Sequence, residues 1–140
     1  MRKYRGKRKD NGEWVYGWYH ELDHGDHRGK AFIMPSHASA LYSYEVDPET
    51  VGQYIGVHDD EGETEIFEGD NIRMMHEGEV ITGNVQYCSG GFILASDDFE
   101  DGFAWISDLT ENDGRYFWIP NSEVIGNRWS NPKLLGEVRE

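Results

Sequence analysis

The feature that most constrains the fold of this chain is the spacing of its apolar residues, which form short alternating segments. In EWVYGWY, residues 13–19, one face of an extended strand would carry Trp14, Tyr16 and Trp18, and the other Val15, Gly17 and Tyr19. From Ile66 onward, short apolar segments recur every eight to twelve residues, at 70–74, 80–87, 92–95, 103–106, 116–119 and 124–125. This spacing predicts an all-β protein whose short strands form a small barrel or sandwich.

One segment departs from the strand pattern. Residues 47–50 have the composition of a helix start, with Asp47 as the N-cap and Pro48 at the first helical position. Because Gly52 follows closely and glycine weakens a helix, we expect one short helical turn near residues 47–52.

The first nine residues concentrate positive charge. They contain six of the chain's 13 lysines and arginines: Arg2, Lys3, Arg5, Lys7, Arg8 and Lys9. The turn sequence Asp10-Asn11-Gly12 follows them and precedes the alternating segment, which predicts a β-hairpin. Lysine and arginine at alternating positions are typical of a protected edge strand, and we predict that the first strand lies at an edge.

The same hairpin supplies a candidate interaction surface: Arg5, Lys7, Arg8 and Lys9 with Tyr16 and Trp18. Basic side chains beside aromatic rings can bind nucleic acid, by contacting phosphates and by stacking on bases. The alternative is that these cations pair with acidic residues of the same chain. The choice between the two depends on the charge of the rest of the molecule.

That charge is strongly negative. The formal net charge is -14, and between Glu45 and Glu123 there are 20 acidic residues against two basic ones. A surface of this kind repels a polyanion, so a protein is the partner we expect, with nucleic acid as the alternative. The acidic residues are expected to form a solvated surface, or else a face that binds a basic partner. Homo-oligomerisation stays open.

Two absences from the sequence bear on the compartment. Cys88 is the only cysteine, so neither an intrachain disulfide nor a thiolate zinc cluster can form. No apolar run approaches the roughly 18 residues that would span a bilayer. We therefore expect a protein of a reducing cytoplasm that does not enter a membrane.

Three histidines form the best metal candidate in the sequence. His20, His24 and His27 lie close together in HELDHGDH with Asp23 and Asp26, and imidazoles and carboxylates are ligands for zinc or a harder divalent ion. Gly25 and the flanking strand signals place the three rings in a hairpin turn, where they would not converge readily. We expect an exposed polar loop here, and we predict no catalytic residue and no cofactor.

The aromatic residues admit two interpretations. Five tryptophans and eight tyrosines could form a stacking platform or a peptide groove on a small β-protein. The simpler expectation is that most of them fill the core, because thin β-lobes need large side chains.

Three stretches of this chain together resemble one known family. They are Tyr4-Arg5-Gly6-Lys7 with residues 12–17 (GEWVYG), VDPETVGQYIGVHDDEGETEIFEGDNI at residues 46–72, and EVIGNRWSNPKLL at residues 123–135. The chain is similar, from end to end, to the YopX family of phage and prophage proteins. Tyr4 stands where phenylalanine is usual, and residues 59–64 are more acidic than the usual lysine-bearing turn.

The resemblance implies an all-β protein with an SH3-like barrel in its C-terminal part. With the chain's modest length, we expect two small lobes that form one compact unit: a hairpin-rich lobe at residues 1–58 and the barrel lobe at residues 59–140. The resemblance also implies a phage accessory protein that acts in the cytoplasm of its bacterial host, with a host or phage protein as its partner, and it supplies no reaction. Independently of the resemblance, the residues near position 69 predict a turn that leads into a strand. In Phe67-Glu68-Gly69-Asp70 we expect Gly69 to make the turn and Asp70 to accept hydrogen bonds from local amides.

Overall fold

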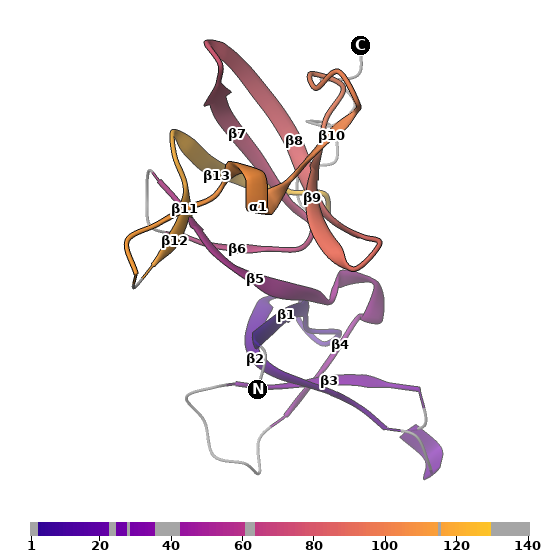
Figure 1. Cartoon of the computed structure of the whole chain (residues 1–140). Coiled ribbons are helices and arrows are strands. Elements are labelled where there is room, and N and C mark those ends of the chain that lie inside the picture. Colours follow the sequence, from indigo (N-terminus) through magenta and orange to yellow (C-terminus); the bar gives the residue numbers. More distant parts are fainter. Residues whose placement is uncertain are drawn as a thin grey trace. The chain divides into compact units, whose positions relative to one another are not determined.

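The computed structural model describes residues 3–22, 25–27, 29–35, 43–60, 64–114 and 116–129. The chain divides into two compact units, Met1–Tyr54 and Ile55–Glu140. Strands dominate both units (Figure 1), which confirms the all-β class. Within the described part of the chain, no helix is both long enough and apolar enough to cross a membrane.

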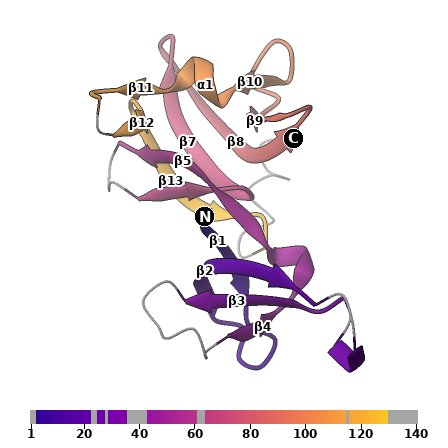
Figure 2. The same ribbon diagram turned by 60° about the horizontal axis from the view of Figure 1, so that its bottom comes forward.

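The first unit is an antiparallel sheet. Its elements are β1 (Lys3–Lys7), β2 (Trp14–Glu21), η1 (Gly25–His27), β3 (Ala31–Pro35), β4 (Tyr44–Val46), η2 (Pro48–Thr50) and the start of β5 (Gly52–Asp59). The strands follow the order β5-β1-β2-β3-β4, and β1 to β4 can be followed in Figure 2. The predicted hairpin is confirmed, since β1 and β2 are antiparallel and Gly12 in their turn has a φ of +73°.

The predicted edge position of the first strand is wrong. On its far side β1 also pairs with β5, through Tyr4–Gln53 and Arg5–Gly52. Strand β5 was not expected, because its sequence contains Gly52 and Gly56 and shows no clear alternation. The positive charges of β1 therefore lie on an inner strand of the sheet.

As predicted, successive side chains of β2 lie on opposite faces of the sheet. Val15 is buried with Ala31, Ile33 and Val46 in a small aliphatic core, whereas Tyr16 on the opposite face is exposed. The helical turn after β4 is confirmed as well. Asp47 caps η2 by accepting a hydrogen bond from the backbone N–H of Glu49 at 3.1 Å.

The second unit contains the remaining strands and one helical turn. These are the end of β5, then β6 (Glu65–Phe67), β7 (Asp70–His76), β8 (Glu79–Cys88), β9 (Gly91–Ala95), β10 (Phe103–Trp105), α1 (Ile106–Leu109), β11 (Glu111–Asn112), β12 (Phe117–Ile119) and β13 (Ser122–Asn127). One sheet has the antiparallel order β10-β9-β8-β7-β13. In the other ladder, β12 pairs with β11 on one side and runs parallel to β5 on the other.

This arrangement differs from the closed barrel that the resemblance implied. Among the described residues the five-stranded ladder ends at β10 and at β13, so its hydrogen bonding does not close into a ring. The two ladders instead enclose an apolar core, whose most deeply buried members are Ile66, Ile72, Val85, Leu94 and Ile119.

The turn before β7 forms as the sequence predicts. Gly69 has a φ of +97°, and Asp70 Oδ2 accepts a hydrogen bond from the Phe67 N–H at 2.7 Å. The structure adds a buried amide that the sequence did not single out. Asn84 Nδ2 donates to Gly69 O and to Asn71 Oδ1, both at 2.9 Å, and so fixes the turn to β8.

Aromatic residues contribute to the core less completely than the sequence predicts. In the described ranges the buried apolar side chains are aliphatic apart from Phe67. The tryptophans are half-buried or exposed: Trp14, Trp18, Trp105, Trp118 and Trp129. Branched aliphatic side chains fill the centre of each core, and partly buried aromatic residues pack against them: Tyr4, Tyr19, Tyr44, Phe92 and Phe99.

Candidate functional site

The basic residues of the opening hairpin contact aromatic rings of their own unit. Arg5 is only 5% exposed, and its guanidinium carbon lies 4.7 Å from the centre of the Trp14 ring. Lys7 Nζ lies 5.5 Å from the same ring. Because both cations share one aromatic partner, cation–π attraction helps to hold the β1–β2 face together.

The next two basic residues form ion pairs. Arg8 donates to both carboxylate oxygens of Asp10, at 3.0 and 2.7 Å, and its guanidinium lies 4.0 Å from the Tyr44 ring centre. The hydrogen bonds from Arg8 hold the pKa of the Asp10 carboxyl below its usual range. Lys9 Nζ lies 3.2 Å from Glu45 Oε2.

The two aromatic members of this candidate surface are Tyr16, 42% exposed, and Trp18, half-buried. Strand register places them opposite β1 cations, with Arg5 facing Tyr16 and Lys3 facing Trp18. A ligand-binding role for this set of residues stays a prediction. Its four cations are seen here in contact with carboxylates and rings of the same unit.

These contacts predict that Arg5 matters for stability and that Lys9 hardly does. We expect Arg5→Gln to lower the free energy of unfolding by about 1 to 2 kcal/mol, because a buried stem and a cation–π contact are lost. Lys9→Gln, the matched control, removes an exposed pair and should have little effect. Urea denaturation at low and high salt checks this, since the Arg5 effect should persist at high salt. Equal losses for the two variants would contradict it.

Of the histidine cluster, only part is described. His20 is exposed on β2, and its ring stacks on Phe32 with centroids 5.5 Å apart. His24 and the side chain of His27 lie outside the described residues. No group of three or more His, Cys, Asp or Glu residues in the described ranges could hold a metal ion. The three-histidine site therefore stays a hypothesis.

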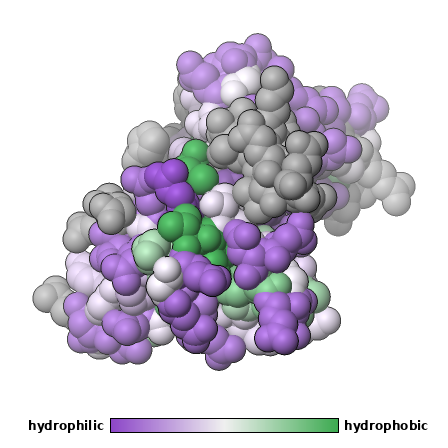
Figure 3. Space-filling model, turned by 90° about the horizontal axis from the view of Figure 1, so that it is seen from above, coloured by the Kyte–Doolittle hydropathy of each residue, from purple (hydrophilic) through white to green (hydrophobic). Residues whose placement is uncertain are grey.

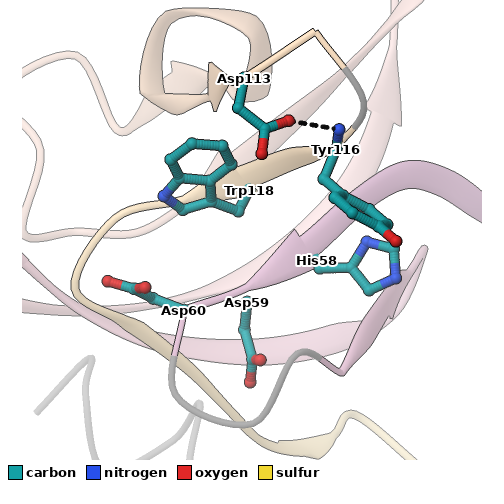
Figure 4. A pocket seen from close by; sticks show the side chains of 6 residues that line it. All are labelled: His58, Asp59, Asp60, Asp113, Tyr116 and Trp118. Carbon is teal, nitrogen blue, oxygen red and sulfur yellow. Dashed lines mark hydrogen bonds between the residues drawn. The ribbon is translucent and has the colours of Figure 1, made fainter.

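The second unit contains a pocket of about 350 Å³ that the sequence did not indicate. Its lining comes from the end of β5 and from the β11–β12 hairpin: His58, Asp59, Asp60, Asp113, Tyr116 and Trp118 (Figure 4). We call it the acidic–aromatic pocket. The parallel pairing of Trp118 with His58 brings its two halves together.

The three carboxylates of this pocket have different roles. Asp59 is 3% exposed, and its two oxygens accept backbone hydrogen bonds from Thr64 at 2.8 Å and Val124 at 2.9 Å. Asp60 and Asp113 are exposed. Both accept hydrogen bonds from the backbone, Asp60 Oδ2 from Asn121 at 2.6 Å and Asp113 Oδ1 from Tyr116 at 2.8 Å. Asp59 therefore serves the fold, and the other two present negative charge at the surface.

Aromatic rings complete the pocket. The Tyr116 ring meets His58 edge-on, with centroids 6.3 Å apart, and 58% of Tyr116 is exposed. Figure 4 shows these two rings on one side and the Trp118 indole with Asp113 and Asp60 on the other. Ring faces and carboxylates both attract cations, so the pocket suits an ammonium or guanidinium group.

The distribution of charge between the units favours the same ligand. Residues 1–54 contain eight basic and eight acidic residues, whereas residues 55–140 contain five basic and 19 acidic ones. The second unit thus carries the whole net charge of -14. The residues that are coloured by hydropathy in Figure 3 are mostly hydrophilic on the face shown. A cationic ligand would be steered toward the second unit.

Comparison with known proteins gives three findings. The family model described as YopX protein matches residues 3–136. The crystal structure of protein EF1440 from Enterococcus faecalis is similar over 96% of this chain and 98% of that one, with a TM-score of 0.53 and 21% identity, which shows the fold alone. Among curated proteins, no match was found. Since the family match covers nearly the whole chain, the protein belongs to the YopX family.

Proposed function

We propose that this protein is a non-enzymatic interaction or regulatory module of a phage or prophage, acting in the cytoplasm of the bacterial host. Its partner is a protein, and the acidic–aromatic pocket holds a lysine or arginine side chain of that partner. Membership in the YopX family supports the phage setting. The observation that carries the binding role is the grouping of Asp60, Asp113, Tyr116 and Trp118 around one cavity.

The physical case depends on combining weak attractions. One cation–π contact at an exposed site contributes about 0.5 to 1 kcal/mol, and more once water is excluded. A guanidinium or ammonium group in this pocket would meet ring faces and carboxylates together. The negative field of the second unit would also raise the rate of encounter with a basic partner. The affinity for the bound side chain therefore depends on the pocket. The long-range attraction of the basic partner depends on the charge of the whole second unit.

A second candidate function, binding of single-stranded nucleic acid, is favoured by one feature of the first unit. Strands β1 and β2 place Lys3, Arg5 and Lys7 directly opposite Trp18, Tyr16 and Trp14. This unit is neutral overall, so it repels a polyanion less than the second unit does. It ranks second because Arg5 and Lys7 already lie against Trp14.

Charge removal at the pocket tests the first proposal. Asp60→Asn with Asp113→Asn keeps an oxygen acceptor for each backbone N–H and removes two negative charges. Asp97→Asn with Asp101→Asn is the matched control, because both residues are exposed elsewhere in the same unit. Immobilised wild type and control should capture the same partner from host lysate, and the pocket variant should retain about a tenth or less of it, equivalent to roughly 1.4 kcal/mol.

Equal capture by the pocket variant and its control would overturn the assignment to the pocket. Binding of single-stranded DNA in fluorescence anisotropy, with an affinity that falls steeply as salt rises, would favour the second candidate.

A further inference from the structure

A second hollow, of about 500 Å³, lies in the second unit. Its apolar lining includes Ile55, Val57, Phe92, Trp105 and Phe117. Phe117 is 49% exposed and Trp105 36%, large values for such apolar side chains. We call this hollow the aromatic groove.

The acidic–aromatic pocket and the aromatic groove lie on opposite faces of one small sheet. Successive side chains of a strand point to opposite faces, and directly paired residues share a face. Trp118 pairs with His58 and with Glu111, which places all three on the pocket face. Phe117 pairs with Asn112, and both line the groove. One face of this sheet is therefore acidic and the other apolar.

Strand β11 is a free edge of this sheet. In the described part of the chain it pairs only with β12, and both of its residues are exposed. The Asp113 N–H donates to Tyr116 O at 3.3 Å. Because inward and outward backbone groups alternate in an antiparallel pair, the N–H and C=O of Asn112 point away from β12. A further strand can form backbone hydrogen bonds there.

We propose that the β11 edge receives an extended segment of the protein partner in which basic and apolar side chains alternate. This inference rests on the proposed function and specifies the chemistry of its ligand. In such a segment every second side chain would lie on the face of Glu111 and Asp113, beside the pocket, and the intervening ones on the face of Asn112 and Phe117, beside the groove. Basic residues match the first face by charge, and apolar residues match the second.

Because the β11 edge is short, the side chains of the added segment must provide the specificity for its sequence. Two residues of β11 offer few backbone hydrogen bonds, so strand addition alone would be weak and would accept any sequence. The two hollows select alternate side chains of the same added strand. A peptide with the same composition in a different order cannot satisfy both faces.

Two synthetic peptides test this inference on the full-length protein. In one, arginine and leucine alternate; in the other, the same residues are grouped into an arginine block and a leucine block. Isothermal titration should show that the alternating peptide binds about tenfold more tightly than the block peptide. N-methylation of alternate peptide nitrogens, which removes the donors facing β11, should abolish this preference.

A protein variant gives independent evidence. Asn112→Pro removes the outward N–H of β11, and Asn112→Ala is its control, because both lose the side-chain acceptor of the Gly114 N–H. We expect the alanine variant to keep the preference for the alternating peptide and the proline variant to lose it. The N-methylated peptide keeps the test valid even if the proline variant fails to fold.

The outcomes separate this inference from the proposed function. The two peptides could instead bind with equal affinity, and N-methylation could leave that affinity unchanged. If the Asp60→Asn, Asp113→Asn variant then lost this binding, strand addition would be overturned, but the proposal that the pocket binds a cation would be supported. Failure of both peptides to bind would overturn both proposals. A preference for the alternating peptide that depends on its N–H groups supports both.

Discussion

Gly17→Ala is expected to unfold the first unit. A Cβ atom at this position would overlap the carbonyl oxygen of Met34 and lie 2.9 Å from the Cα of Pro35, because β2 and β3 approach closely there. Backbone atoms cannot move aside as a flexible side chain can. We expect a loss of about 3 kcal/mol or more in the free energy of unfolding, a large part of what a small aliphatic core supplies.

Gly12→Ala is the control for this substitution. Gly12 has a φ of +73°, but a Cβ there would meet nothing within 4 Å, so the cost is backbone strain alone, about 1 kcal/mol. Urea denaturation followed by tryptophan fluorescence measures both variants, and amide spectra show which unit loses structure. If the two glycine variants unfold at the same urea concentration, the close approach of β2 and β3 is wrong.

Asn84→Leu is expected to destabilise the second unit by about 3 kcal/mol, although leucine is similar in size and more apolar. Asn84 is 1% exposed, and its amide donates to Gly69 O, Asp70 O and Asn71 Oδ1. Leucine would leave these buried acceptors without their donor. The loss should appear in chemical denaturation and in faster amide exchange around residues 67–71.

Gln86→Leu serves as the comparison on the same strand. Gln86 is half-buried, and among the described residues its amide donates to Asn84 Oδ1 alone, at a long 3.4 Å. We expect its replacement to cost less than about 1 kcal/mol. A stable Asn84→Leu protein, as resistant to urea as Gln86→Leu, would show that the buried amide does not hold the turn to β8.

The pattern of the sequence was sufficient for the local elements. Alternation in residues 13–19 placed Val15 in the core and Tyr16 at the surface, and Asp10-Asn11-Gly12 marked the hairpin turn. Asp47 and Pro48 marked the helical turn. Each of these depends on residues a few positions apart, whose conformational preferences act within one segment.

Pairing between distant segments could not be found in the same way. The first strand carries the charges of an edge strand, yet it lies between β2 and β5, because two residues of β5 occupy its other side. Asp59 sits in an acidic turn sequence, yet it is buried and accepts hydrogen bonds from Thr64 and Val124. A carboxylate gives no local sign that a backbone N–H from 65 positions away will meet it.

The sequence by itself determined the all-β class, most of the strands, the three local turns and the family resemblance, because two-residue periodicity and turn chemistry are short-range properties. Only the tertiary structure decided which strands are edges and which polar residues are buried. It also decided that the acidic–aromatic pocket exists, since the parallel pairing of β12 with β5 joins residues 58–60 to Asp113, Tyr116 and Trp118. Such pairing depends on the burial of both sheets against a shared core, a property of the whole unit and of no single segment.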